Sequence, residues 1–308
     1  MRFLERVECR RIAMSEVTDA IILAGGLGTR MLPASLYMPK ETMPLVDTPI
    51  LNHLIWEATK AGVERIHIVL SERKFKILGD FFDEGGMGVH ADIRSDLPQI
   101  SLTPRVEGVE IITHIQPSAG GVADAMSVAL GSIDGPFIVI LGDNLLVEEH
   151  VSPLHSGPEG ASGASLSLVK RFEENGSPCV AVFRVPRAEV SKYGCVKFDG
   201  DQVSEIAEKP EANEAPSEFV LCGRYLFPSN TAKILELFPR DSFGEMQSIS
   251  LMGYLIENGG LEAVKLQGYQ FYDSGDPLSW LKSQIDHSLR REDLAKDLRE
   301  WIGRRIRE

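Results

Sequence analysis

One stretch near the N-terminus constrains the fold of this chain more than any other. Residues 20–23 are apolar and can form a short strand that is buried on both faces of a sheet. Residues 25–28 include three glycines, which permit positive φ and let backbone N–H groups approach an anion. Arg30 and Lys40 add two cations just downstream. A strand, a glycine-rich turn and two cations together predict a phosphate cradle at the carboxyl end of a strand.

Two common phosphate-binding motifs do not match this stretch. A dinucleotide fingerprint requires glycine at position 31, where this chain has Met31. A P-loop requires Gly-Lys-Ser/Thr, whereas residues 28–30 are Gly-Thr-Arg. An ordinary turn with a surface arginine is the alternative interpretation. The combination Gly-Gly-x-Gly-Thr-Arg with Pro33 and Pro39 at this spacing is far more specific, so we favour the phosphate cradle.

Composition limits the class of protein. With 308 residues, 43% of them hydrophobic, the chain can bury the core of one large domain or two small ones. Its net charge of −13 at pH 7 argues against a nucleic-acid partner. No apolar run approaches the roughly 18 residues of a transmembrane helix, and residues 1–11 lack the apolar segment of a signal peptide. We therefore expect a cytoplasmic protein with no membrane partner.

The cysteines also predict a reducing, cytoplasmic compartment. They are widely separated and form no C-x-x-C pair, which favours buried free thiols over disulfides or a zinc site. The four positions are Cys9, Cys179, Cys195 and Cys222.

Hydrophobic periodicity predicts a parallel sheet in the first half of the chain. Residues 49–61 carry an apolar stripe at helical spacing, and the apolar run at 66–70 follows as a strand. A strand, a helix and a strand at this spacing form a βαβ unit with a right-handed crossover. Further strands are predicted at 109–116 and 137–141, with a helix at 122–130 between them.

The second half of the chain predicts a β-rich lobe. We expect strands at 164–170, 179–185, 194–198, 203–207 and 219–227. Helices are predicted at 277–289 and 292–306, and the last one packs either on its own domain or on a second subunit of a homo-oligomer. The fold class is therefore α/β, with a Rossmann-like mixed, mostly parallel sheet flanked by helices, a β-rich lobe and C-terminal helices.

Two polar residues follow predicted strands at the edge where open α/β sheets bind ligands. Asp143 follows the strand at 137–141 and can reach a hard cation such as Mg²⁺, which prefers oxygen ligands. A simple turn aspartate is the alternative. Gln116 ends the strand at 109–116, and its amide can pair with a donor and an acceptor on a pyrimidine. With Gly121 five residues later, the segment predicts a base pocket or a plain helix cap, and the cradle upstream favours the pocket.

These motifs resemble the signature of the sugar-phosphate nucleotidyltransferases, the enzymes that make nucleotide sugars. Residues 25–33 and 39–47 are most similar to the bacterial and archaeal glucose-1-phosphate uridylyltransferases (UDP-glucose pyrophosphorylases), and the resemblance covers about residues 18–288. Residues 116–118 and 142–144 are closer to the thymidylyltransferases. The resemblance therefore leaves the choice between UTP and dTTP open.

The resemblance also implies a domain organisation. Residues 1–14 would be an N-terminal extension and a candidate for disorder, residues 15–288 a nucleotidyltransferase domain, and residues 289–308 a C-terminal helix. Within the domain, a nucleotide half would span about residues 15–160 and a sugar-binding half about residues 161–288.

The resemblance assigns roles to individual residues. Those implied to bind the nucleotide are Leu23, Ala24, Gly25, Gly26, Gly28, Thr29, Gln116, Gly121 and Asp143. Those implied to bind the sugar phosphate are Gly194, Glu208, Lys209, Gly223 and Tyr225. Asp143 and Asp273 would hold Mg²⁺. Arg30, Lys40 and Lys209 would be the catalytic cations.

The reaction implied is the transfer of a nucleotidyl group from a nucleoside triphosphate to a sugar 1-phosphate. UTP and α-D-glucose 1-phosphate would give UDP-glucose and pyrophosphate, with dTTP as the alternative nucleotide. A catalytically silent, ligand-sensing relative is the alternative from another class. Retention of both metal carboxylates together with three cations favours the active enzyme.

Overall fold

A computed structural model describes residues 16–82, 96–98, 100, 103, 105–238 and 246–307. In it, the apolar run near the N-terminus forms an inner strand of the main sheet. This strand, β1 (Asp19–Leu23), pairs in parallel with β4 (Arg65–Ser71) and β6 (Phe137–Leu141). Strand β5 (Glu110–Gln116) adds in parallel to β4. Because these strands run in the same direction, their carboxyl ends meet at one edge of the sheet, as predicted.

The same sheet continues into the second half of the chain. Strand β11 (Phe219–Phe227) pairs antiparallel with β6, and the order of the nine strands is β5-β4-β1-β6-β11-β8-β12-β10-β9. The remaining members are β8 (Cys179–Arg184), β9 (Gly194–Asp199), β10 (Gln202–Glu208) and β12 (Glu262–Lys265). The predicted α/β fold with a mixed sheet is confirmed, whereas the division of the domain near residue 160 stays a prediction.

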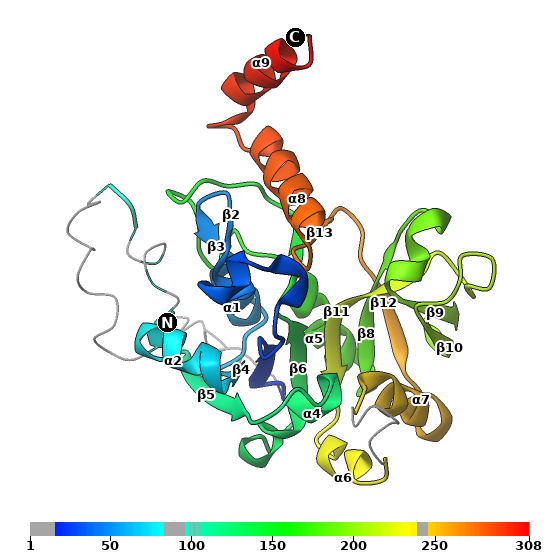
Figure 1. Ribbon diagram of the computed structural model, residues 1–308. Helices are drawn as coiled ribbons and strands as arrows, with labels where there is room; N and C mark the ends of the chain where they lie inside the picture. Colours follow the sequence, from blue (N-terminus) through cyan, green and yellow to red (C-terminus); the bar gives the residue numbers. More distant parts are fainter. Residues whose placement is uncertain are drawn as a thin grey trace, which may run out of the picture.

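Helices cover both faces of this sheet, so its strands are apolar on both sides (Figure 1). On one face α1 (Ile50–Lys60), α2 (Glu72–Phe82) and α5 (Ala164–Asn175) pack with Ile22. On the other face α4 (Val122–Ser127), α6 (Thr231–Leu235) and α7 (Ser248–Asn258) pack with Ile21. The alternating side chains of β1 thus feed two separate cores.

Helix α5 corrects the sequence interpretation, which predicted a strand at 164–170. Its buried side chains lie on one helical face, and the helix ends at Gly176, whose φ is 72°. The pattern was missed because a polar residue, Ser165, belongs to the buried face and donates to Glu57 Oε1 at 2.6 Å. Helix α4 also ends earlier than predicted, at Ser127, and a 3₁₀ turn follows at Leu130–Ser132.

Two small sheets and the last helices complete the chain. Strand β7 (Asn144–Val147) pairs with β13 (Gln270–Asp273), and β2 (Pro44–Leu45) pairs with β3 (Thr48–Pro49). Asp276 caps α8 (Pro277–Arg290) by accepting two backbone N–H groups, as predicted. Helix α9 (Ala295–Arg305) has no buried residue and extends beyond α8, away from the sheet (Figure 1).

The remaining sequence predictions concern the cysteines, the N-terminal extension and membrane spans. Cys179, Cys195 and Cys222 are buried free thiols. Cys9 and the predicted extension at 1–14 lie outside the described residues. Within the part of the chain that is described, no helix is long and apolar enough to cross a membrane.

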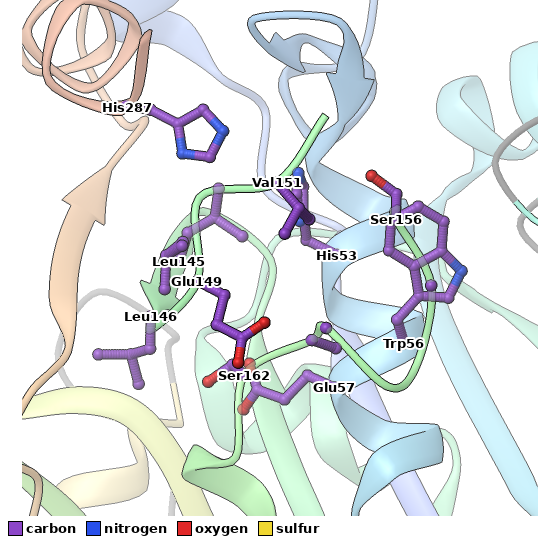
Figure 2. Close-up of a pocket in the computed structure, with 14 residues that line it drawn as sticks. His53, Trp56, Glu57, Leu145, Leu146, Glu149, Val151, Ser156, Ser162 and His287 are labelled. Carbon is purple, nitrogen blue, oxygen red and sulfur yellow. The ribbon is translucent and has the colours of Figure 1, made fainter. Parts of the chain in front are cut away.

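Three histidines meet where α8 packs on the body of the domain. His150 Nδ1 and His287 Nδ1 are 2.9 Å apart, and the ring centroids of His53 and His287 are 6.5 Å apart. His53 and His287 also line a cavity of about 20 Å³, room for a single water molecule (Figure 2). Burial lowers the pKa of His53 to about 4 and that of His287 to about 3, where the neighbouring His53, His150 and Arg291 add to the effect.

The histidine cluster predicts a loss of stability in mild acid. Each pKa is lowered in the folded state, so the unfolded chain binds protons first as the pH falls below about 6.5. Between pH 6 and pH 5, the free energy of unfolding should fall by about 1.2 kcal/mol for each buried histidine. His287→Gln should remove one such contribution in urea titrations, whereas the exposed His155→Gln should not. Equal pH dependence in His287→Gln and the wild type would contradict the assignment.

Candidate active site

The glycine-rich turn leaves the sheet at the end of β1. Ala24 N–H still donates to Val69 O at 2.9 Å, and the chain then turns through Gly28, whose φ of 67° lies in the left-handed region. The turn is closed by Ser35 Oγ, which donates to Gly28 O at 2.8 Å, and a 3₁₀ helix, η1 (Thr29–Met31), follows. Gly26 and Thr29 are exposed at the tip. The turn therefore presents backbone to solvent at the carboxyl edge of the sheet.

A buried ion pair supports this turn from behind. Lys74 Nζ, on α2, donates to Ala24 O at 2.7 Å and to both oxygens of Glu41 at 2.9 and 2.7 Å. Lys74 is 5% exposed and Glu41 is 1% exposed. Burial lowers the pKa of Lys74 and raises the pKa of Glu41, so each needs the other to stay charged. The pair joins α2, the turn and the 3₁₀ helix η3 (Lys40–Thr42).

Asp143 meets Lys40 beside the turn. Gly142 N–H donates to Leu23 O at 3.0 Å, and a Cβ at position 142 would lie only 2.6 Å from that oxygen, so only glycine fits. The next residue, Asp143, accepts a hydrogen bond from Lys40 Nζ at 2.5 Å. Burial raises the pKa of Asp143, but the charge and hydrogen bond of Lys40 outweigh it and leave the pKa below its usual value. Lys40, whose pKa is raised against the effect of burial by Asp143, also stays charged.

Strand pairing brings the second carboxylate to the same place. In the β7–β13 pair Asp273 lies opposite Asn144, and Ser274 N–H and Oγ donate to Asp143 O at 3.0 and 2.9 Å. Burial raises the pKa of Asp273, and the negative charge of Asp143 raises it further. Arg30 lies nearby, and its charge lowers the pKa of Asp273: a Cβ at Gly275 would lie 2.6 Å from Arg30 Nη2 and 2.9 Å from Asp273 Oδ1.

These two carboxylates fit a hard divalent cation. Magnesium-like ions take oxygen ligands, are commonly held by one or two carboxylates and complete their shell with water and substrate phosphates. Among the described residues no cluster of three or more acidic, histidine or cysteine side chains forms a metal cage. Asp143 and Asp273 are two carboxylates that could hold such a cation, and a cation between them would offset the repulsion that raises the pKa of Asp273.

Gln116, one of the two residues predicted to form a base pocket, lies against the same turn. Gln116, the last residue of β5, is 6% exposed, and its Nε2 donates to Asp124 Oδ2 at 2.8 Å. A Cβ at Gly25 would lie 2.7 Å from Gln116 Oε1, so the amide oxygen faces the glycine-rich turn. Gly121 has a φ of 92°, and a Cβ there would lie 2.6 Å from Met246 O. Gln116 thus borders the glycine-rich turn, whereas Gly121 packs against the Met246 backbone.

The residues predicted to bind the sugar lie on β9, β10 and β11. Gly194 pairs with Glu208, whose Oε2 would lie 3.3 Å from a Cβ at Gly194. Gly223 has a φ of 74° at the register shift of β11, and a Cβ there would lie 2.9 Å from Asn144 Nδ2. Tyr225 is buried; burial raises the pKa of its hydroxyl, and the charges of Glu208 and Asp143 add to the effect. Tyr225 therefore lies close enough to both Glu208 and Asp143 for their charges to affect its pKa.

Lys209 differs from the other predicted cations. Its φ of 42° is left-handed, a strained conformation for a residue with a side chain. Its side chain is 63% exposed, and its Nζ lies 3.5 Å from Glu208 Oε1 rather than beside Asp143. The structure therefore gathers Arg30, Lys40, Asp143 and Asp273 at one point and leaves Lys209 on the exposed rim of the sugar side.

Sequence reasoning missed the residues that hold the predicted ones in place. Lys74 lies among mostly exposed residues of α2, so its neighbours in the sequence do not indicate that it is buried. Glu41 lies within the motif at residues 39–47, but the resemblance assigns it no role. Asp124 occupies the first turn of α4, where acidic residues are common for electrostatic reasons alone.

Comparison with known proteins defines the class. The family model described as nucleotidyl transferase matches residues 19–287. A "UTP--glucose-1-phosphate uridylyltransferase 2" of Streptococcus pyogenes serotype M3 is 30% identical over 298 residues, covering 94% of this chain and 96% of the relative. The UTP-bound UGPase of Acinetobacter baumannii superposes with a TM-score of 0.77 at 26% identity, covering 93% of this chain and 98% of that one. A second structure, UDP-glucose pyrophosphorylase from the same organism, gives a TM-score of 0.78 at 25% identity, with coverages of 94% and 99%.

An α/β sheet with a glycine-rich turn, two cations and two carboxylates at its carboxyl edge is the architecture of an enzyme that handles phosphate groups. The chain belongs to the nucleotidyl transferase family. Members of this family generally use a divalent metal ion, in agreement with the chemistry of the two carboxylates.

The buried Lys74–Glu41 pair predicts a large effect of single substitutions. Lys74→Met leaves Glu41 buried without its partner and should lower the free energy of unfolding by about 3 kcal/mol. The double variant Glu41→Gln with Lys74→Met should recover much of this loss, because no unpaired charge remains. Urea denaturation measures both.

A matched control is available on the same helix. Lys76 pairs with Glu72 at 2.8 Å, but both side chains are exposed. Lys76→Met should therefore change the free energy of unfolding by less than about 1 kcal/mol. Equal effects of Lys74→Met and Lys76→Met would contradict a supporting role for the buried pair.

Proposed function

We propose that this protein is a UTP–glucose-1-phosphate uridylyltransferase, which joins UTP and α-D-glucose 1-phosphate to give UDP-glucose and pyrophosphate. The observation that carries the proposal is the convergence of Arg30, Lys40, Asp143 and Asp273 at the glycine-rich turn. The similar Streptococcus pyogenes protein bears this enzyme's name, and the similar Acinetobacter baumannii structure is described as UTP-bound.

The reaction requires that the two substrates are positioned and their negative charge is offset, and it requires no general base. The attacking phosphate oxygen of the sugar 1-phosphate is already an anion, so the barrier lies in bringing two polyanions together in line. In this proposal the backbone of residues 24–29 and the Arg30 guanidinium bind the triphosphate. Lys40, held at the site by Asp143, neutralises charge on the triphosphate side.

Asp143 and Asp273 are the proposed ligands of Mg²⁺. When bound, Mg²⁺ would supply positive charge that offsets the negative charge of the substrate phosphates. The chain's own contribution is to pair Asp273 with Asn144, the residue after Asp143, while Ser274 donates to the Asp143 carbonyl. The positive charge of Arg30 offsets part of the negative charge of Asp273.

The sugar 1-phosphate is proposed to lie between β9, β10 and β11. Glu208 accepts hydrogen bonds from sugar hydroxyls, and Gly194 and Gly223 let the ring approach the backbone. Lys209 binds the sugar phosphate from the rim, where its exposed side chain is free to reorient. Tyr225 packs below the ring.

The second candidate nucleotide is dTTP. It is favoured by residues 116–118 and 142–144, which are similar to the thymidylyltransferases. We further propose a cytoplasmic location, where nucleoside triphosphates are available. A homo-oligomer stays a prediction that rests on the uncovered helix α9.

A substrate panel tests the function directly. Purified enzyme with Mg²⁺ should release pyrophosphate with UTP and glucose 1-phosphate at least tenfold faster than with ATP or GTP. Comparable rates with dTTP would support the second candidate. No pyrophosphate from any pair of nucleotide and sugar 1-phosphate would overturn the proposed enzyme and favour a silent relative.

Substitutions test the site residues. Asp143→Asn and Lys209→Ala should each lower kcat/KM by about 10²–10³, because each removes a charge that the transition state needs. Far-ultraviolet circular dichroism should stay that of the wild type. Asp199→Asn, in an exposed hairpin turn, is the control and should keep full activity. Wild-type turnover in Asp143→Asn or Lys209→Ala would contradict the role proposed for that residue.

A further inference from the structure

Gln116 is held in one orientation by a carboxylate. Its Nε2 donates to Asp124 Oδ2 at 2.8 Å, and both side chains are buried, at 6% and 8% exposed. An ionised carboxylate can only accept hydrogen bonds, so the amide nitrogen must face Asp124. The amide oxygen then faces the opposite way, toward Gly25, where a Cβ would lie 2.7 Å from Gln116 Oε1.

The backbone around Asp124 holds this arrangement in place. Ala123 N–H donates to Met246 O at 2.9 Å, and Met246 N–H donates to Gly120 O at 2.7 Å. Ser127 Oγ also donates to the Asp124 carbonyl at 2.7 Å, a bond within α4 that does not involve the Asp124 carboxylate. The first turn of α4 is thereby tied to the chain before α7, and Asp124 is kept within reach of Gln116.

We propose that Asp124 is a positioning residue for nucleotide choice: by orienting Gln116, it makes the pocket select a base with an N3–H group over one with an N3 lone pair. The inference rests on the proposed function, in which Gln116 faces the base. Uracil and thymine carry a donor at N3, which matches Gln116 Oε1. Cytosine carries an acceptor at N3, so two lone pairs would face each other.

The role of Asp124 follows from the symmetry of an amide. An unrestrained glutamine can exchange its oxygen and nitrogen by rotating about its last torsion, and would then donate to N3 of cytosine. An acceptor-only neighbour removes that second orientation. A site that leaves a buried polar group unpaired discriminates strongly against the wrong ligand. Asp124 thus contributes to specificity without touching the base.

Asp124→Asn is the decisive variant, because asparagine has the same shape but can either donate or accept. Pyrophosphate release with UTP and with CTP, each with glucose 1-phosphate, gives the ratio of the two kcat/KM values. We expect this ratio to fall at least tenfold in Asp124→Asn, mainly through a higher kcat/KM for CTP. Asp124→Ser, in which a hydroxyl also donates and accepts, should lower the ratio in the same way if the asparagine variant does not fold.

Two further variants separate positioning from a merely structural role. Glutamate at position 116 accepts with both oxygens, so the double variant Gln116→Glu with Asp124→Asn should regain preference for UTP over CTP. Ser127→Ala removes a hydrogen bond to the Asp124 backbone and should leave the ratio unchanged. A purely structural Asp124 would lower kcat/KM for both nucleotides equally and keep the ratio constant.

The outcomes distinguish this inference from the proposed function. A wild-type ratio in a folded, active Asp124→Asn or Asp124→Ser enzyme would overturn the role of Asp124 and leave the uridylyltransferase intact. No pyrophosphate from the wild-type enzyme with any nucleotide would overturn the proposed function itself. A lower ratio in Asp124→Asn together with its recovery in the double variant supports the positioning role.

Discussion

Backbone pairing between β1 and β6 brings the whole site together. Leu23 lies opposite Leu141 in parallel register, and Gly142 N–H donates to Leu23 O immediately beyond the last pair. Because the strands are parallel, the chain leaves both at the same edge of the sheet. Lys40 and Asp143, 103 positions apart in the chain, can therefore form a hydrogen bond. The close approach is possible only because residue 142 has no side chain.

The charges at this edge are balanced in pairs before any substrate binds. Lys40 neutralises Asp143, Arg30 lies beside Asp273, and Lys74 with Glu41 forms a fully buried pair behind the turn. Burial opposes the charges of the Lys40–Asp143 and Lys74–Glu41 pairs, so each of these groups depends on its partner. Cations gathered in this way allow a site to hold polyanions in a protein of net charge −13.

Prediction succeeded where local pattern and burial agree. The apolar runs at 20–23, 66–70 and 137–141 are strands because both faces of the sheet are covered, so each strand is apolar throughout. It failed at 164–170, where Ser165 lies on the buried face of α5 and bonds Glu57, whose carboxylate also holds the buried Arg224. A polar residue inside the core breaks the helical pattern that the sequence would otherwise display.

The sequence by itself determined the fold class, the glycine-rich turn and the residue types of the site. Strand, turn and helix signals report on neighbours within a few positions, and the motifs carry the chemistry in their side chains. Only the tertiary structure decided which charged and polar side chains pair: Lys74 with Glu41, Gln116 with Asp124, and Lys40 with Asp143. Those pairings depend on strand order and register, which join distant segments, and no local pattern encodes the partner of a buried charge.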